Sequence, residues 1–146
     1  MNYGRLVAAA AAATVVDAVY GFLVYGTLLS GEFGRYPNVY RATDVQTSFL
    51  PLMFVGILIA MCAVTFIYAK GYEGGSGASE GARFGALFGI FAAAFYANVT
   101  YATVNIGRRL AVALAAAGLF EWILAGIAIG LVYKPATPAT RRSAAV

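Results

Sequence analysis

Two acidic residues lie deep inside long apolar stretches of the sequence, and their type and position make them the best candidates for chemistry. Asp17 stands in TVVDAVYGF, and Glu121 stands in GLFEWILAG. An ionised carboxylate near the centre of a bilayer costs about 2.5 to 3.5 kcal/mol even on a lenient insertion scale. Each acid is therefore expected to turn inward, to find a hydrogen-bond donor or to hold a proton.

The two acids are also expected at the same depth in the membrane. Asp17 follows Arg5 by twelve residues, and Tyr133 follows Glu121 by twelve. With a rise of about 1.5 Å per helical residue, both acids would lie about 18 Å from the same membrane face. They share one level if the first and last helices run in opposite directions. The expected hydrogen-bond partners are Tyr20, Tyr25, Asn98, Tyr101, Asn105 and Trp122.

Three roles are open to this buried ionisable pair. In the first role, the acids are struts that join two helices through hydrogen bonds. A polar residue used in this way contributes under about 2 kcal/mol to helix association. As a proton or cation site, two carboxyl groups at one depth would influence each other and share a proton. In the third role, an acid meets a basic group or a cofactor on another subunit.

The composition excludes several classes of function. The chain has no histidine and one cysteine, Cys62, so it lacks the usual ligands of haem, copper and zinc. A Ser-His-Asp or Cys-His set cannot be built either. We expect no enzymatic activity, no bound metal and no cofactor. The net charge of +4 comes from residues at the ends of apolar segments, which favours anionic lipids over nucleic acid as partners.

The elements that position the acids are predicted to be membrane-spanning helices. With 62% hydrophobic and 11% charged residues, the chain is far more apolar than a soluble domain. Four apolar segments approach the roughly 20 residues needed to cross a bilayer, and their unalternating pattern indicates helices rather than strands. We expect an all-α integral membrane protein whose single domain, residues 1–134, is an antiparallel bundle with spans at 6–29, 46–70, 81–104 and 109–133, followed by a flexible tail at 135–146.

Local signals suggest where the second and third helices begin. Thr43 and Gln46 fit a capping box, which would start the second helix near Asp44. Pro51 should bend that helix unless it falls in the first turn. Ser79 is the expected N-cap of the third helix, with its neighbour Glu80 at the positive end of the helix dipole.

Small residues are expected to form the packing faces of the third and fourth helices. They let two backbones approach closely, which is a main source of attraction between helices in lipid. Such faces serve either internal packing of these two helices or docking onto another subunit. The residues in question are Gly81, Gly85, Gly89, Gly118, Gly126 and Gly130.

Aromatic residues gather in two places. A ridge on the third helix is expected to contact core or lipid, or else to line a slot for a quinone, carotenoid or other isoprenoid. It consists of Phe84, Phe88, Phe91 and Phe95. In the first loop, rings alternate with arginines, which is typical of a membrane interface and is also compatible with a docking surface. These rings are Phe33, Tyr36 and Tyr40.

Lysine and arginine set the expected orientation. One side would carry Arg5, Lys70, Arg83, Lys134, Arg141 and Arg142, and the other Arg35, Arg41, Arg108 and Arg109. Because positive charge marks the cytoplasmic side, both termini are expected in the cytoplasm, in a bacterial inner membrane.

The sequence favours a non-enzymatic accessory or structural subunit of a larger membrane complex. Its partners would be membrane lipids and other membrane-protein subunits or further copies of the chain. This hypothesis follows from the small size, the short loops, the small-residue faces and the lack of a catalytic set. The alternatives are a small proton- or cation-coupled carrier that uses Asp17 and Glu121, and an isoprenoid- or lipid-binding membrane protein.

Overall fold

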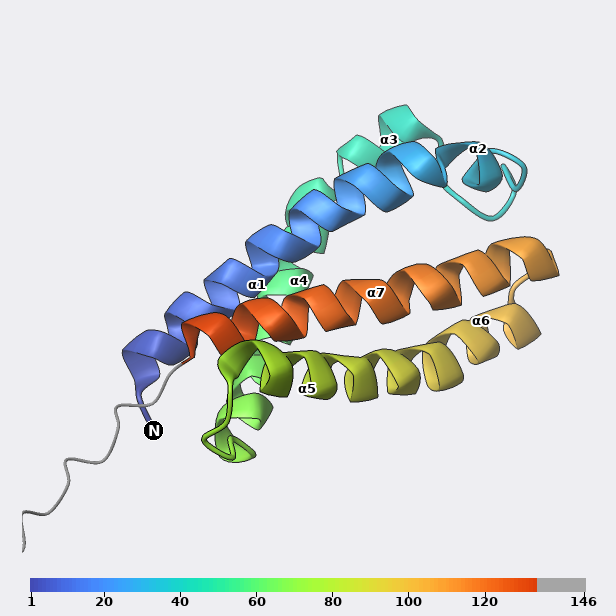
Figure 1. Cartoon of the computed structure of the whole chain (residues 1–146). Helices are drawn as coiled ribbons and strands as arrows, with labels where there is room; N and C mark the ends of the chain where they lie inside the picture. The colour runs from blue at the N-terminus through green and yellow to red at the C-terminus, as the bar shows by residue number, and fades with distance from the viewer. Residues whose placement is uncertain (134–146) are drawn as a thin grey trace, which may run out of the picture.

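The computed structural model describes residues 1–133, and within this range helices are the only regular secondary structure (Figure 1). The elements in chain order are α1 (Tyr3–Leu23), the π-helical turn η1 (Val24–Leu28), α2 (Ser30–Phe33), α3 (Thr43–Thr47), α4 (Leu50–Lys70), α5 (Gly77–Ala92), the π-helical turn η2 (Ala93–Ala97), α6 (Asn98–Thr103) and α7 (Arg108–Val132). The tail expected at 135–146 lies outside the described residues.

Four helical stretches are long and apolar enough to cross a membrane. They are Tyr3–Leu28, Leu50–Lys70, Gly77–Thr103 and Arg108–Val132. The all-helical prediction and the existence of four apolar helices of spanning length are therefore confirmed. Two of these stretches are composite, because α1 continues into η1 and α5 continues through η2 into α6.

The capping box expected at Thr43 does not form. Thr43 is the first residue of α3, and Ala42, which has no hydrogen-bonding side chain, occupies the N-cap. The second helix of the sequence prediction is also divided, since α3 ends at Thr47 and α4 begins at Leu50. Pro51 lies in the first turn of α4. There its missing N–H needs no partner, so it begins a helix and does not bend one.

Ser79 is not the N-cap of the third span, because α5 begins at Gly77 and its N-cap is Ser76. Glu80 does lie in the first turn, and it is buried. Its carboxylate accepts backbone N–H bonds from Glu73 at 2.6 Å and from Gly75 at 2.9 Å. Glu80 thus fastens the preceding loop, which turns back through the positive φ of Gly74, to the start of α5.

α5 and α7 run in opposite directions and pack against each other through their glycine faces. A Cβ on Gly81 would collide with the backbone carbonyl of Gly126, and one on Gly85 with that of Trp122. Gly77 and Gly130 meet in the same way at the next turn. Only glycine allows so close an approach, which explains the spacing of four residues on α5. Of the two alternatives, internal packing is the one observed.

Gly118 does not belong to this contact, contrary to expectation. A Cβ placed on it would have no heavy atom within 4 Å. On α7 it directly precedes Leu119, which is the residue that a Cβ on Gly89 of α5 would meet. Its face of α7 is therefore open at this level.

The main core lies at one end of the molecule, where α1 contacts both α4 and α7 (Figure 1). It gathers residues from the first half of α1, the second half of α4 and the end of α7: Leu6, Ala9, Ala13, Met61, Val64, Tyr68, Ala125, Ile129 and Tyr133. The first half of α4, residues 50–60, contributes no buried residue. The helices are therefore closely packed at this end and separate toward the other.

At the other end, the first loop folds onto the start of α7. Phe33, Tyr36 and Tyr40 pack against a small cluster around Leu110. The backbone N–H of Gly107 donates to the Tyr36 hydroxyl at 3.0 Å. The rings that the sequence suggested for headgroup level or docking thus cover the start of α7.

Candidate functional site

The two intramembrane acids of the sequence analysis face each other between the first and last long helices. Asp17 of α1 and Glu121 of α7 are both half-buried, and they lie close enough for their carboxyl groups to interact. Two carboxyl groups form a hydrogen bond only when one of them supplies a proton, because an ionised carboxylate is an acceptor alone. The two acids thus lie near each other on α1 and α7, and their pairing as a shared site stays a prediction.

Tyrosines from the first span support the pair. The Tyr25 hydroxyl donates to Oε2 of Glu121 at 2.8 Å. The Tyr20 hydroxyl donates at 2.8 Å to the carbonyl oxygen of Ala117, one turn before Glu121 on α7. The two rings meet edge to face, with centroids 6.1 Å apart. Both side chains reach from the α1 side to α7, so they fix the separation of the helices that carry the acids.

Three other expected partners lie elsewhere. Asn98 donates to the carbonyl of Ala94 in its own span, while Tyr101 and Asn105 are exposed. All three residues follow η2, and a π-helical turn holds an additional residue that rotates the faces after it. The residue pattern gives no sign of that rotation.

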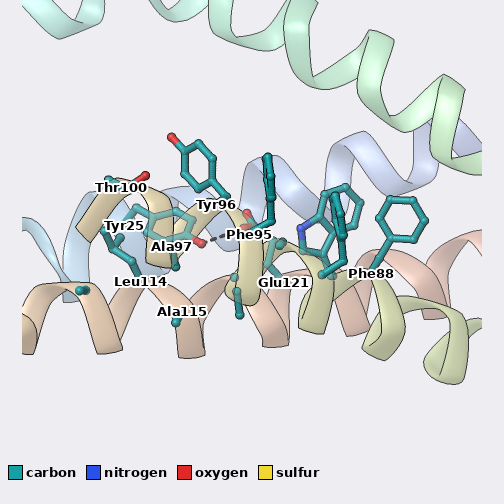
Figure 2. Close-up of a pocket in the computed structure, with 15 residues that line it drawn as sticks. Tyr25, Phe88, Phe95, Tyr96, Ala97, Thr100, Leu114, Ala115 and Glu121 are labelled. Atoms are coloured by element: carbon teal, nitrogen blue, oxygen red, sulfur yellow. Dashed lines mark hydrogen bonds between the residues drawn. The ribbon is translucent and has the colours of Figure 1, made fainter. Parts of the chain in front are cut away.

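Glu121 borders an open cavity of about 490 Å³ (Figure 2). Its polar side chains are few, namely Tyr25, Tyr96, Thr100 and Glu121, together with the indole of Trp122. The remaining lining is aromatic or small and apolar: Phe88, Phe91, Ala92, Ala93, Phe95, Ala97, Ala111, Leu114, Ala115 and Gly118. Figure 2 shows the hydrogen bond from Tyr25 to Glu121 at this cavity, with Phe88, Phe95 and Tyr96 beside it. A carboxyl group is thus presented to an apolar aromatic space.

The aromatic side chains of the wall contact one another. Trp122 packs on Phe88, with ring centroids 5.3 Å apart, and therefore lines the cavity instead of donating across helices. Phe91 and Phe95 stack nearly parallel, with an interplanar angle of 6°. Three residues of the expected aromatic ridge, Phe88, Phe91 and Phe95, thus form one wall of a ligand-sized space, and Phe91 and Phe95 remain exposed. The fourth, Phe84, packs against the main core instead.

Both π-helical turns of the described chain border this cavity. Tyr25 belongs to η1, and Phe95 and Tyr96 belong to η2. Such turns are rare in helices and occur frequently at functional sites. Here they place Tyr25 against Glu121 and Tyr96 on the cavity wall. The sequence analysis missed Tyr96 and the cavity itself, because the residue pattern gives no direct sign of a π-helical turn.

The site offers acidic and hydroxyl oxygens to a ligand. Within residues 1–133, no group of three or more Asp, Glu, Cys or His side chains comes together. The chemistry available is therefore proton exchange at a carboxyl pair, hydrogen bonding and contact with aromatic faces.

Comparison of the chain with protein-family models, with curated proteins and with solved structures finds no match. The function is therefore argued from the site alone.

Proposed function

We propose that this chain is an integral membrane protein with four spanning helices in an antiparallel bundle, and that its Asp17–Glu121 pair exchanges a proton for a cation. The protein would act as a small coupled carrier. The observation that carries this proposal is the position of Glu121, which lines a cavity of about 490 Å³ and has a second acid, Asp17, close by. Ionisable residues inside membrane helices commonly mark the paths of protons, ions or substrates.

The surface of the long helices supports membrane insertion. Large apolar side chains point outward from every span, for instance Val15, Phe22, Ile59, Leu87 and Val112. In water, so much exposed apolar surface would promote aggregation, whereas lipid accommodates it. The opposite directions of α5 and α7, and the contact of the start of α1 with the end of α7, support the antiparallel arrangement.

The distribution of basic residues supports a bacterial inner membrane with both termini in the cytoplasm. Arg5, Lys70 and Arg83 lie at the end of the molecule where the described chain begins and ends, while Arg35 and Arg109 lie at the other. The remaining charges on the first side, Lys134, Arg141 and Arg142, fall outside the described residues. The proposed orientation follows the rule that lysine and arginine collect on the cytoplasmic side.

Charge balance favours exchange. The carboxyl pair is neutral with two protons and carries one negative charge with one proton. Replacing one proton with one monovalent cation therefore keeps the occupied site neutral, which avoids the cost of an unpaired charge in an apolar environment. The donors to Glu121 and to Ala117 are neutral tyrosines. They stabilise the site without supplying a positive charge that would compete with the cation.

The geometry agrees less well with a purely structural strut. A strut needs the two carboxyl groups in contact but gains nothing from an adjoining cavity. Here Glu121 lies near Asp17 and also borders open space. A neutral isoprenoid would suit the apolar wall, but it would leave the carboxyl group without a charged partner.

An accessory subunit remains a second candidate because of one observation on α4. Residues 50–60 of this helix contribute nothing to the core and present apolar side chains outward, among them Leu52 and Ile59. Another membrane helix would fit there. The glycine face of α5 gives no further support to this role, because α7 already covers it. In neither role do we propose enzymatic activity.

Transport into liposomes tests the carrier proposal. The full chain is reconstituted with a pH dye inside, and Na⁺, K⁺ or tetraphenylphosphonium is added outside. We expect at least one of these cations to drive proton movement in the wild type, and Glu121→Gln to abolish it. Glu73→Gln, which changes an exposed acid, is the matched control and should retain it. Absence of a response to all three cations, or a response that survives Glu121→Gln, would overturn the proposal.

A further inference from the structure

We infer that the ligand of this cavity is a lipophilic organic monocation, of the phosphonium or quaternary ammonium class, held between the aromatic wall and the carboxyl of Glu121. This inference rests on the carrier function proposed above and names its substrate class. Three properties of the cavity lead to it: its lining, its charge and its opening.

The lining suits an organic cation better than a bare metal ion. A metal cation such as Na⁺ or K⁺ gives up bound water only for several oxygen ligands. The cavity supplies few oxygens, from Tyr25, Tyr96, Thr100 and Glu121. Its aromatic side chains, by contrast, offer negative ring faces that attract a desolvated organic cation. The described wall therefore favours a ligand with an apolar body.

The charge of the site selects for a cation. Glu121 is the acid that lines the cavity, and Asp17 lies behind it, outside the lining. Tyr20 and Tyr25 from the first span are the titratable groups facing Glu121, and Tyr96 from η2 lines the cavity as well. The part of α5 that lines the cavity brings only phenylalanine and alanine. No lysine or arginine is among the lining residues. An organic anion of the same shape would therefore meet an unbalanced negative charge.

The opening of the cavity faces the apolar surface of the molecule. Phe91 and Phe95 each expose 62% of their surface, and Tyr96 exposes 72%. No residue of α4 lines the cavity, and the first half of α4 is unpacked. In the proposed membrane this side borders lipid, where lipophilic cations concentrate and hydrated ions do not. The route to Glu121 thus selects the same class of ligand as the lining.

The single tryptophan of the chain provides a local measurement. Trp122 lines the cavity, so its fluorescence reports ligand binding there without any label. The full-length protein in detergent micelles is titrated with tetraphenylphosphonium and, separately, with tetraphenylborate, which has nearly the same shape and the opposite charge. We expect saturable quenching by tetraphenylphosphonium, apparent affinity that falls as the pH is lowered because protons compete, and little effect of tetraphenylborate.

Variants separate charge from packing. Glu121→Gln should weaken binding of tetraphenylphosphonium about 10- to 100-fold, because the ligand loses its charged partner. Phe95→Ala should weaken it several-fold, within the range of roughly 2- to 30-fold for a lost cation–aromatic contact. Phe22→Ala, an equally large change at an exposed ring outside the lining, is the control and should bind as the wild type does.

Three outcomes would overturn the inference: equal binding of both ions, wild-type binding in Glu121→Gln, or no binding of tetraphenylphosphonium. Equal binding would instead indicate a general lipid or isoprenoid slot. The carrier proposal fails separately. If Na⁺ or K⁺ drives proton movement while tetraphenylphosphonium does not bind, the substrate class is wrong and the carrier stands. If tetraphenylphosphonium binds as expected but no cation drives proton movement, the substrate class stands and the carrier does not.

Discussion

The hydroxyl of Tyr25 donates a 2.8 Å hydrogen bond to Oε2 of Glu121, and it joins two residues 96 positions apart in the sequence. This bond connects the end of the first span to the middle of the last. It also orients one carboxyl oxygen through a neutral donor, and no lysine or arginine is among the described residues that line the cavity. Glu121 is thereby held at the edge of the cavity with its negative charge available to a ligand.

Removing the Tyr25 hydroxyl should leave the Glu121 carboxyl group in place but less firmly oriented. Tyr25→Phe takes away one hydrogen bond to an acid, and we expect the free energy of unfolding to fall by about 1 to 3 kcal/mol. The infrared band of the Glu121 carboxyl should shift as well, which a general loss of packing would not cause. Tyr3→Phe changes an exposed tyrosine at the start of α1 and is the control. An unchanged carboxyl band in Tyr25→Phe would contradict the assigned hydrogen bond.

The glycine contact between α5 and α7 should tolerate no added methyl group. Gly85→Ala would bring a Cβ against the carbonyl of Trp122, so we expect it to destabilise the protein by about 1 to 3 kcal/mol. Gly56→Ala on α4 meets nothing within 4 Å. It should be neutral or stabilise by up to about 1 kcal/mol, because alanine favours the helix. Thermal unfolding in detergent measures both, and equal stability of the two variants would contradict the packing.

The buried carboxylate of Glu80 should hold the loop before α5. Glu80→Gln replaces charge-assisted bonds to the N–H groups of Glu73 and Gly75. We expect a loss of about 1 to 3 kcal/mol and faster hydrogen exchange at those two amides. Glu73→Gln is the matched control, since it removes only an exposed ion pair with Arg83 and should cost under about 1 kcal/mol. Slow exchange at both amides in Glu80→Gln would be inconsistent with this role.

The proposed orientation can be tested with the chain's single cysteine removed. On a Cys62→Ala background, Asn38→Cys lies in the loop between α2 and α3, and Ser76→Cys lies at the start of α5. We expect a membrane-impermeant maleimide to label Asn38→Cys in intact cells and Ser76→Cys only after permeabilisation. The reverse pattern would mean that the termini face outward.

The sequence was sufficient for the parts of the site that follow from regular helices. Helical rise alone put Asp17 and Glu121 at one height, and the spacing of Gly81, Gly85 and Gly89 indicated the face that meets α7. Both features depend on periodicity, which the residue pattern records directly. Tyr25 was also expected as a partner, and it does donate to Glu121, although it does so from the π-helical turn η1, which the sequence did not predict.

The remaining features depend on breaks in that periodicity. The π-helical turn η2 rotates the residues after it, so Asn98, Tyr101 and Asn105 lie away from the acids, while Tyr96 lines the cavity. Pro51 could either bend a helix or begin one, and the choice depended on the turn at Ser48 and Phe49. The cavity lies between residues of η1, α5, η2, α6 and α7, and no local residue pattern encodes the space left between such distant segments.

Proton release on ligand binding tests the central claim most directly, because it asks whether a cation and a proton compete for the Asp17–Glu121 pair. Tetraphenylphosphonium is added to the full-length protein in weakly buffered detergent solution, and a pH dye counts the protons. At a pH low enough for the free pair to hold two protons, we expect about one proton per bound cation in the wild type and none in Glu121→Gln. Binding without proton release in the wild type, or the same release from Glu121→Gln, would contradict the account.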